Sequence, residues 1–124
     1  MNPLKLSPLG HTWILDLDGT LLKHNGYLLD GRDSFLPGAQ AFLGGIPPQD
    51  MVILLTARGE ECRAATERFL AENAVRYDHL IFGAPFGERI LVNDQKPSGL
   101  GTAIAVNVPR NDLAGVCFEI DDTL

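Results

Sequence analysis

One stretch of the chain joins an apolar run to a cluster of polar residues, and it constrains the fold more than any other. Residues 13–20 read Trp-Ile-Leu-Asp-Leu-Asp-Gly-Thr. If the apolar run forms a strand, side chains alternate between its faces, so Asp16 and Asp18 point the same way at its carboxyl end. Two adjacent carboxylates repel each other, which a divalent cation or a shared proton offsets. Gly19 lets the backbone approach an anion, and Thr20 can hydrogen-bond a carboxylate.

The rest of the chain alternates between strand and helix patterns. Residues 51–56 form a continuous apolar run, typical of a strand that is buried on both faces. Residues 60–73 carry acidic residues in the first turn and an apolar stripe at helical spacing, which predicts a helix. The other predicted elements are strands at 12–17, 79–82, 89–93, 103–108 and 116–120, and a short helix after Pro37. This alternation predicts an α/β fold with a mostly parallel sheet that is covered on both sides.

Polar residues follow three of the predicted strands. Asp16 and Asp18 end the first strand, Thr56 ends the strand at 51–56, and Asp94 follows the strand at 89–93. In parallel sheets, sites form at the carboxyl ends of the strands. We therefore expect these four residues to lie together although they are far apart in the sequence.

Length, charge and cysteine content narrow the class of protein. The 124 residues suit one domain, so residues 1–124 are expected to form a single unit. A net charge of -6 and a pI of about 4.8 argue against a binder of bulk nucleic acid, although a single terminal phosphate stays open. No apolar run reaches the roughly 18 residues of a membrane span, and no signal-peptide pattern is present, which predicts a cytoplasmic protein without membrane contact. Two cysteines are too few for a disulfide framework or a zinc site.

The string hydrophobic-Asp-x-Asp-Gly-Thr resembles the first motif of the haloacid dehalogenase (HAD) superfamily of phosphohydrolases. Asp-x-Asp alone would also fit a polar turn after a strand. Two later features are similar to the family pattern: Thr56 is followed by Ala57 and Arg58, like the family's T-x-R, and Asp94 follows a later hydrophobic strand. The resemblance covers residues 12–108 and implies a Rossmann-like three-layer sandwich. The intervals between motifs are only about 40 residues long, so no cap domain is expected.

The resemblance also implies roles for individual residues. Asp16 would be the nucleophile that forms an aspartyl-phosphate, and Asp18 the general acid and base. Asp16, Asp18 through its backbone carbonyl, and Asp94 would bind Mg²⁺, and Asn93 could add an amide oxygen. The phosphate would be held by Gly19, Thr56, Ala57, Arg58 and a further cation.

The identity of that cation is the weakest part of the match. The family usually has a basic residue just before the strand that carries the metal ligand, and no lysine lies between residues 56 and 94. Lys96 follows Asp94 closely and is the favoured candidate. Arg89 begins the strand at 89–93 and is the second choice.

The expected activity is Mg²⁺-dependent hydrolysis of a phosphate monoester, on a small sugar or nucleotide phosphate. Without a cap the site is open, and residues 23–35, here called the flap, are the candidate for a mobile cover. A second subunit in a homo-oligomer could also cover it. Two other functions fit the sequence. One is a phosphate-binding regulatory protein with little turnover, which the missing lysine favours. The other is a receiver-like module that accepts a phosphate as a signal, but the Asp-x-Asp-Gly-Thr string argues against it because such a module needs a lone acceptor aspartate.

Overall fold

Three parallel strands form the central sheet. A computed structural model describes residues 2–113 and 115–124. In it, β2 (Thr12–Leu15), β3 (Met51–Leu55) and β4 (His79–Ile81) lie in the order β2-β3-β4. Thr12 pairs with Met51, and Ile53 pairs with His79. The prediction of an α/β fold with parallel strands is confirmed, and the three strands lie where the apolar runs placed them.

A second, smaller sheet joins two segments that are distant in the sequence. β1 (Leu4–Leu6) pairs in parallel with β5 (Phe118–Ile120), with Leu4 opposite Phe118. Lys5 and Glu119 form an ion pair across this sheet. β5 lies inside the strand predicted at 116–120, whereas β1 was not predicted, because three residues are too short to show a periodic pattern.

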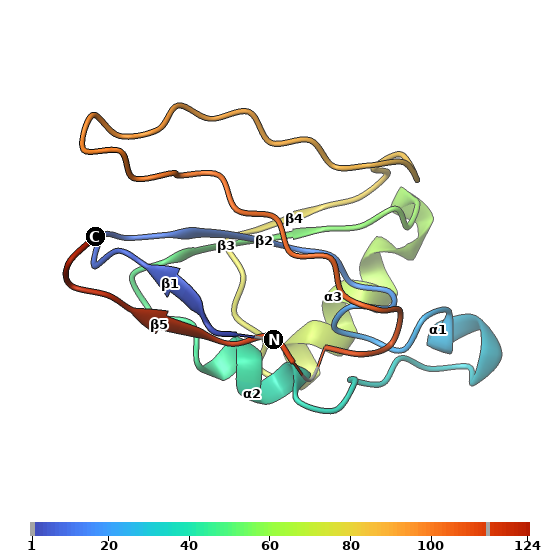
Figure 1. Ribbon diagram of the computed structural model, residues 1–124. Helices are drawn as coiled ribbons and strands as arrows, with labels where there is room; N and C mark the ends of the chain where they lie inside the picture. Colours follow the sequence, from blue (N-terminus) through green and yellow to red (C-terminus); the bar gives the residue numbers. More distant parts are fainter. Residues whose placement is uncertain (1, 114) are drawn as a thin grey trace.

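Helices connect the strands and cover one face of the central sheet. α2 (Ala39–Gly44) and α3 (Arg63–Glu72) lie on the same side of the sheet in Figure 1. The 3₁₀ turn η1 (Glu60–Cys62) leads into α3, so the predicted helix at 60–73 is confirmed. The single helical turn α1 (Gly26–Leu29) lies within the flap. Among the described residues, no helix is both long and apolar enough to cross a membrane.

The core lies between the central sheet and these helices. Leu54 of β3, Ala39 of α2 and Leu70 of α3 are all at most 1% exposed. The opposite face of β3 is different, because Met51 is 42% exposed. The prediction that the strand at 51–56 is buried on both faces is therefore wrong: the helices that were expected on the second face are not found there among the described residues.

An extended segment, residues 84–108, takes the place of the predicted second layer. Neither the strand predicted at 89–93 nor the one at 103–108 is present, and Figure 1 shows this segment, in orange, running out and back on the side of the sheet away from α2 and α3. Its internal backbone hydrogen bonds are confined to a turn at residues 96–100. Apolar composition favours strands, but a strand also needs a hydrogen-bonded neighbour, which these runs lack.

Candidate functional site

The loop that follows β2, here called the acidic loop because it carries Asp16 and Asp18, is tightly wound around one carbonyl group. The carbonyl oxygen of Leu17 accepts hydrogen bonds from the backbone N–H groups of Thr20, Leu21 and Leu22 at 3.1, 3.0 and 2.9 Å. Gly19 has a φ of +84°, a conformation that L-residues with side chains rarely adopt. The loop therefore requires glycine at this position, and it projects Asp16 and Asp18 at the carboxyl end of the strand.

Asp16 is the accessible carboxylate of the loop. Its side chain is 36% exposed, and its Oδ2 accepts a hydrogen bond from the Thr20 hydroxyl at 3.0 Å. Nη2 of Arg89 lies 3.8 Å from its Oδ1. The cation beside the predicted nucleophile is thus Arg89, the second choice from the sequence. The favoured Lys96 lies in the turn at residues 96–100 of the extended segment, where only its backbone is engaged.

Asp18 is held in a fork by Arg58. The Arg58 Nε donates to Oδ2 of Asp18 at 2.9 Å, and Nη2 donates to Oδ1 at 2.8 Å. Such bidentate pairs between a guanidinium and a carboxylate fix orientation as well as distance. Asp18 is therefore positioned, with both of its oxygens already accepting hydrogen bonds.

Arg58 has further partners in the flap and in α3. Nη1 and Nη2 donate to Asp33 at 3.0 and 2.7 Å, and Nη1 also donates to the Thr66 hydroxyl at 3.0 Å. The ring of Tyr27 lies 4.2 Å from the guanidinium carbon, a cation–π contact. Burial opposes the charged guanidinium, but the hydrogen bonds to Asp18 and Asp33 outweigh it and raise the pKa of Arg58.

The prediction that Arg58 binds the phosphate is not met by this arrangement. A guanidinium has five N–H donors, and each of those on Arg58 has a protein acceptor. Thr56 is 1% exposed, and its hydroxyl oxygen accepts the backbone N–H of Arg58 at 3.0 Å, so it closes its own turn. Ala57 is partly buried in the same turn.

The predicted magnesium site is not assembled in this arrangement. The described part of the chain contains no group of three or more His, Cys, Asp or Glu side chains that could hold a metal ion. Asp94 lies in the extended segment, where its backbone carbonyl accepts the Thr102 hydroxyl. The Asn93 amide also donates to that hydroxyl, at 2.7 Å. Asp94 fails to join Asp16 and Asp18 because the strand that would have carried it to the sheet is absent.

A turn at residues 109–112 packs on the acidic loop. The backbone N–H of Asn111 donates to the Gly19 carbonyl at 2.8 Å, and the Asn111 side chain accepts the backbone N–H of His24 at 2.8 Å. A Cβ added to Gly19 would lie 3.3 Å from Cγ of Arg110. The sequence does not predict Arg110, Asn111 or Asp33 as part of the site. Pro-Arg-Asn-Asp at 109–112 is a turn signal, but it does not reveal which loop the turn contacts.

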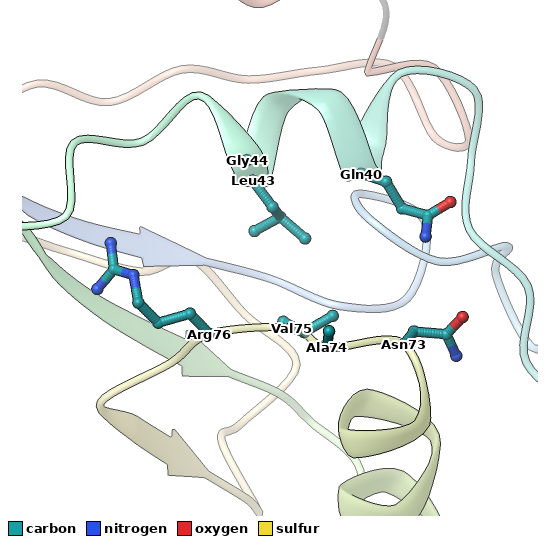
Figure 2. Close-up of a pocket in the computed structure, with 7 residues that line it drawn as sticks. All are labelled: Gln40, Leu43, Gly44, Asn73, Ala74, Val75 and Arg76. Carbon is teal, nitrogen blue, oxygen red and sulfur yellow. The ribbon is translucent and has the colours of Figure 1, made fainter.

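A cavity in another part of the molecule does not include Asp16 or Asp18. Figure 2 shows it between α2 and the chain that follows α3, with a volume of about 120 Å³. None of its lining residues belongs to the acidic loop. Arg76, the one charged side chain among them, donates to the backbone carbonyls of Asp50 and Pro47. The acidic loop, rather than this cavity, is the candidate site.

Comparisons with known proteins give one similar structure. No protein-family model matches the chain, and no curated protein matches it. The chain is similar to one chain of the Pnkp1/Rnl/Hen1 RNA repair complex, with a TM-score of 0.50 and 27% sequence identity. The match covers 71% of this chain and 30% of that one, so this chain spans less than a third of the length of its structural neighbour.

Proposed function

We propose that the protein is a HAD-type phosphatase that hydrolyses a phosphate monoester with Asp16 as its nucleophile. One observation carries the proposal: Asp16 is an exposed carboxylate at the carboxyl end of a parallel strand, oriented by Thr20 and faced by Arg89. That strand end is where sites form in parallel sheets. The nearby guanidinium offsets the negative charge that a phosphate would otherwise meet.

The proposed reaction has two displacements. Asp16 attacks phosphorus, the bond to the leaving oxygen breaks, and an aspartyl-phosphate forms. Asp18 supplies the proton for the leaving oxygen and then takes one from the water that cleaves the aspartyl-phosphate and releases inorganic phosphate. The fork from Arg58 suits the carboxylate form of Asp18 that takes the proton. In the first displacement, a protonated Asp18 has to give up one of its two bonds to Arg58.

The proposed reaction is expected to require Mg²⁺, and the assay with EDTA tests this requirement. Asp16 and Asp18 are oxygen donors at one strand end, which suits a hard cation. With Asp94 outside the cluster, the residues as arranged do not complete a metal site, so no step is assigned to the ion.

A small sugar or nucleotide phosphate is the proposed substrate, because a net charge of -6 opposes long polyanions. A second candidate is the terminal phosphate of an RNA strand. The similarity to a chain of an RNA repair complex favours it, and so do Arg89 and Arg110 beside the acidic loop. A regulatory phosphate-binding protein with little turnover is the alternative to both.

The test is phosphate release from sugar phosphates, nucleotides and short RNAs with a 5′- or 3′-terminal phosphate, with Mg²⁺ or with EDTA. Asp16→Asn removes the nucleophile with almost no change in volume and should lower kcat on the order of 10³-fold or more. Asp122→Asn makes the same substitution at an exposed carboxylate in the C-terminal turn and should leave kcat unchanged. Equal activity in wild type and Asp16→Asn would contradict the mechanism, and no release from any compound would favour the regulatory protein.

A further inference from the structure

Arg58 is a junction of three parts of the chain. Its N–H groups donate to Asp18 in the acidic loop, Asp33 in the flap and Thr66 in α3. The residue is only 6% exposed, and all five of its N–H groups have acceptors within the protein. A phosphate oxygen could therefore bind Arg58 only by displacing Asp18, Asp33 or the Thr66 hydroxyl from one of its N–H groups.

The flap is a closed loop with few anchors to the body of the protein. Its ends are joined by the hydrogen bond from the Lys23 N–H to the Ser34 carbonyl at 2.9 Å and by an antiparallel bridge between Leu22 and Phe35. At its tip, α1 exposes its apolar side chains to solvent, with Leu28 68% and Leu29 71% exposed. Such a loop can move as a unit about its closed ends.

Arg58 contacts the flap at two points within that loop. Asp33 is 6% exposed at its side chain and takes two hydrogen bonds from the guanidinium, and the Tyr27 ring stacks on the same group. Near the loop ends, Phe35 packs on Phe69 of α3, with ring centroids 5.0 Å apart. The charged anchor of the flap is therefore the same guanidinium that orients Asp18.

We propose that Arg58 is a positioning residue that couples the docked flap to the orientation of Asp18. While Asp33 accepts its two hydrogen bonds, it fixes the plane of the Arg58 guanidinium. The two hydrogen bonds from the same guanidinium then hold Asp18 in one orientation. Loss of Asp33 frees both the flap and one edge of the guanidinium. The catalytic consequence for Asp18 rests on the proposed function, whereas the docking of the flap by Arg58 does not.

The first test measures the flap itself, by amide hydrogen exchange over residues 23–35. Asp33→Asn keeps the shape of the side chain and removes the charge of the anchor. It should speed exchange in the flap at least tenfold, because charge-assisted hydrogen bonds to a buried group are lost. The matched control is Asp30→Asn, which breaks the exposed pair with Lys23 in the same loop and should change exchange less than twofold. Unchanged exchange in Asp33→Asn would overturn the proposal.

The second test separates positioning from phosphate binding. Arg58→Lys keeps the charge but cannot form two forks, so kcat should fall at least 30-fold while KM changes less than threefold. A phosphate ligand would give the opposite split, a higher KM with kcat largely kept, and that result would overturn the proposal. Amide hydrogen exchange in α3 and β3 at the wild-type rate shows that each variant is folded.

The two tests also separate this proposal from the proposed function. If the wild type releases no phosphate from any compound, the phosphatase proposal fails, and the exchange rates of Asp33→Asn and Asp30→Asn still decide whether Arg58 anchors the flap. If the wild type turns over and Asp33→Asn leaves the flap unchanged, the coupling fails and the phosphatase stands.

Discussion

At the scale of single residues, the environment of Asp16 differs from that of Asp18 in one respect that matters for chemistry. Among the described residues, Oδ1 of Asp16 accepts no hydrogen bond and lies 3.8 Å from Nη2 of Arg89. Asp18 has both oxygens bound to Arg58. The two carboxylates thus have different surroundings, and the more accessible Asp16 is the one that the proposed mechanism uses as nucleophile.

The choice between the two candidate cations can be decided by mutation. Arg89→Gln removes the positive charge beside Asp16 and should lower kcat/KM by about 10- to 100-fold, because that charge offsets the charge of the phosphoryl group. Lys96→Gln is the matched control, and its effect should stay below about threefold. Steady-state kinetics on both variants give the comparison, and a larger loss in Lys96→Gln would reinstate the cation that the sequence favoured.

The sequence predicts Asp16 and Asp18 as site residues and Thr20 as a hydrogen-bond donor to a carboxylate, but it does not reveal the contacts of Arg58. Asp16 and Asp18 follow from the alternation of side chains along one strand, which is a local property. The sequence predicts that Arg58 binds a phosphate, whereas the contacts of its side chain are to Asp18, to Asp33, 25 residues earlier, and to Thr66. Such contacts are set by how the loops pack, which no local periodicity records.

At the scale of elements, a buried carboxylate joins the amino ends of β2 and β3. Asp50 precedes β3, its side chain is fully buried, and it accepts hydrogen bonds from the His11 N–H at 3.0 Å, the His11 ring at 2.8 Å and the Trp13 indole at 3.0 Å. Burial works against the carboxylate, but the bonds from Trp13 and His11 outweigh it and lower the pKa of Asp50. This cluster fixes the strands at the end opposite the candidate site.

The lowered pKa of Asp50 makes its contribution to stability depend on pH. A carboxyl group whose pKa is lower in the folded protein stabilises it above the unfolded value of 3.8, and this stabilisation is lost as the pH falls through the folded value. Asp50→Asn should lower the free energy of unfolding by about 2–3 kcal/mol at pH 7, because its amide turns a donor toward Trp13 or His11. The difference from wild type should shrink below about pH 3.8.

Urea unfolding, followed by the fluorescence of the single tryptophan, Trp13, measures this difference at each pH. Asp78→Asn is not a suitable control, because Asp78 accepts the Val52 N–H at 2.7 Å. Asp122→Asn, at an exposed position, is suitable and should give the wild-type curve. A pH-independent loss of stability in Asp50→Asn would show that packing, not charge, is responsible.

The elements that could be predicted are those whose pattern is sustained by a neighbour in the fold. The run at 51–56 lies between two strands, and the stripe of α3 packs on the sheet, so local pattern and tertiary contact agree. The runs at 89–93 and 103–108 have the same apolar character, but no strand pairs with them. Without the strand at 89–93, Asp94 is not carried to the edge of the sheet where Asp16 and Asp18 lie, so the placement of one element decides which residues the site can contain.

At the scale of the whole molecule, the extended segment leaves large apolar side chains in water. Phe86, Ile90 and Val92 are 92%, 84% and 89% exposed. Apolar side chains exposed to this degree on one segment favour an interaction site if they gather into one patch. β2 and β4, the outer strands of the central sheet, also offer unpaired backbone groups on their outer edges.

This surface predicts that the protein associates with itself, in line with the homo-oligomer expected from an open site. Sedimentation at increasing protein concentration should show a rising average mass. The double variant Ile90→Glu/Val92→Glu should shift the protein toward monomer by at least a tenfold weaker association, because it places charges in the contact. Leu28→Glu/Leu29→Glu adds the same two charges at exposed leucines of α1 and should leave the association unchanged. A wild type that stays monomeric at all concentrations would contradict the prediction.

The hydrogen bonds between Asn111 and the chain around the acidic loop form between segments that are synthesised at different times. β2, β3, β4 and α3 all lie within residues 12–81, whereas Asn111, which binds the Gly19 carbonyl and the His24 N–H, comes 30 residues later. At about 5–20 residues per second, a ribosome needs about 2–6 seconds to add them. Residues 12–81, which contain the central sheet, are therefore synthesised seconds before Asn111, so the hydrogen bonds that hold the loop carrying Asp16 can form only after all three strands of that sheet have been made.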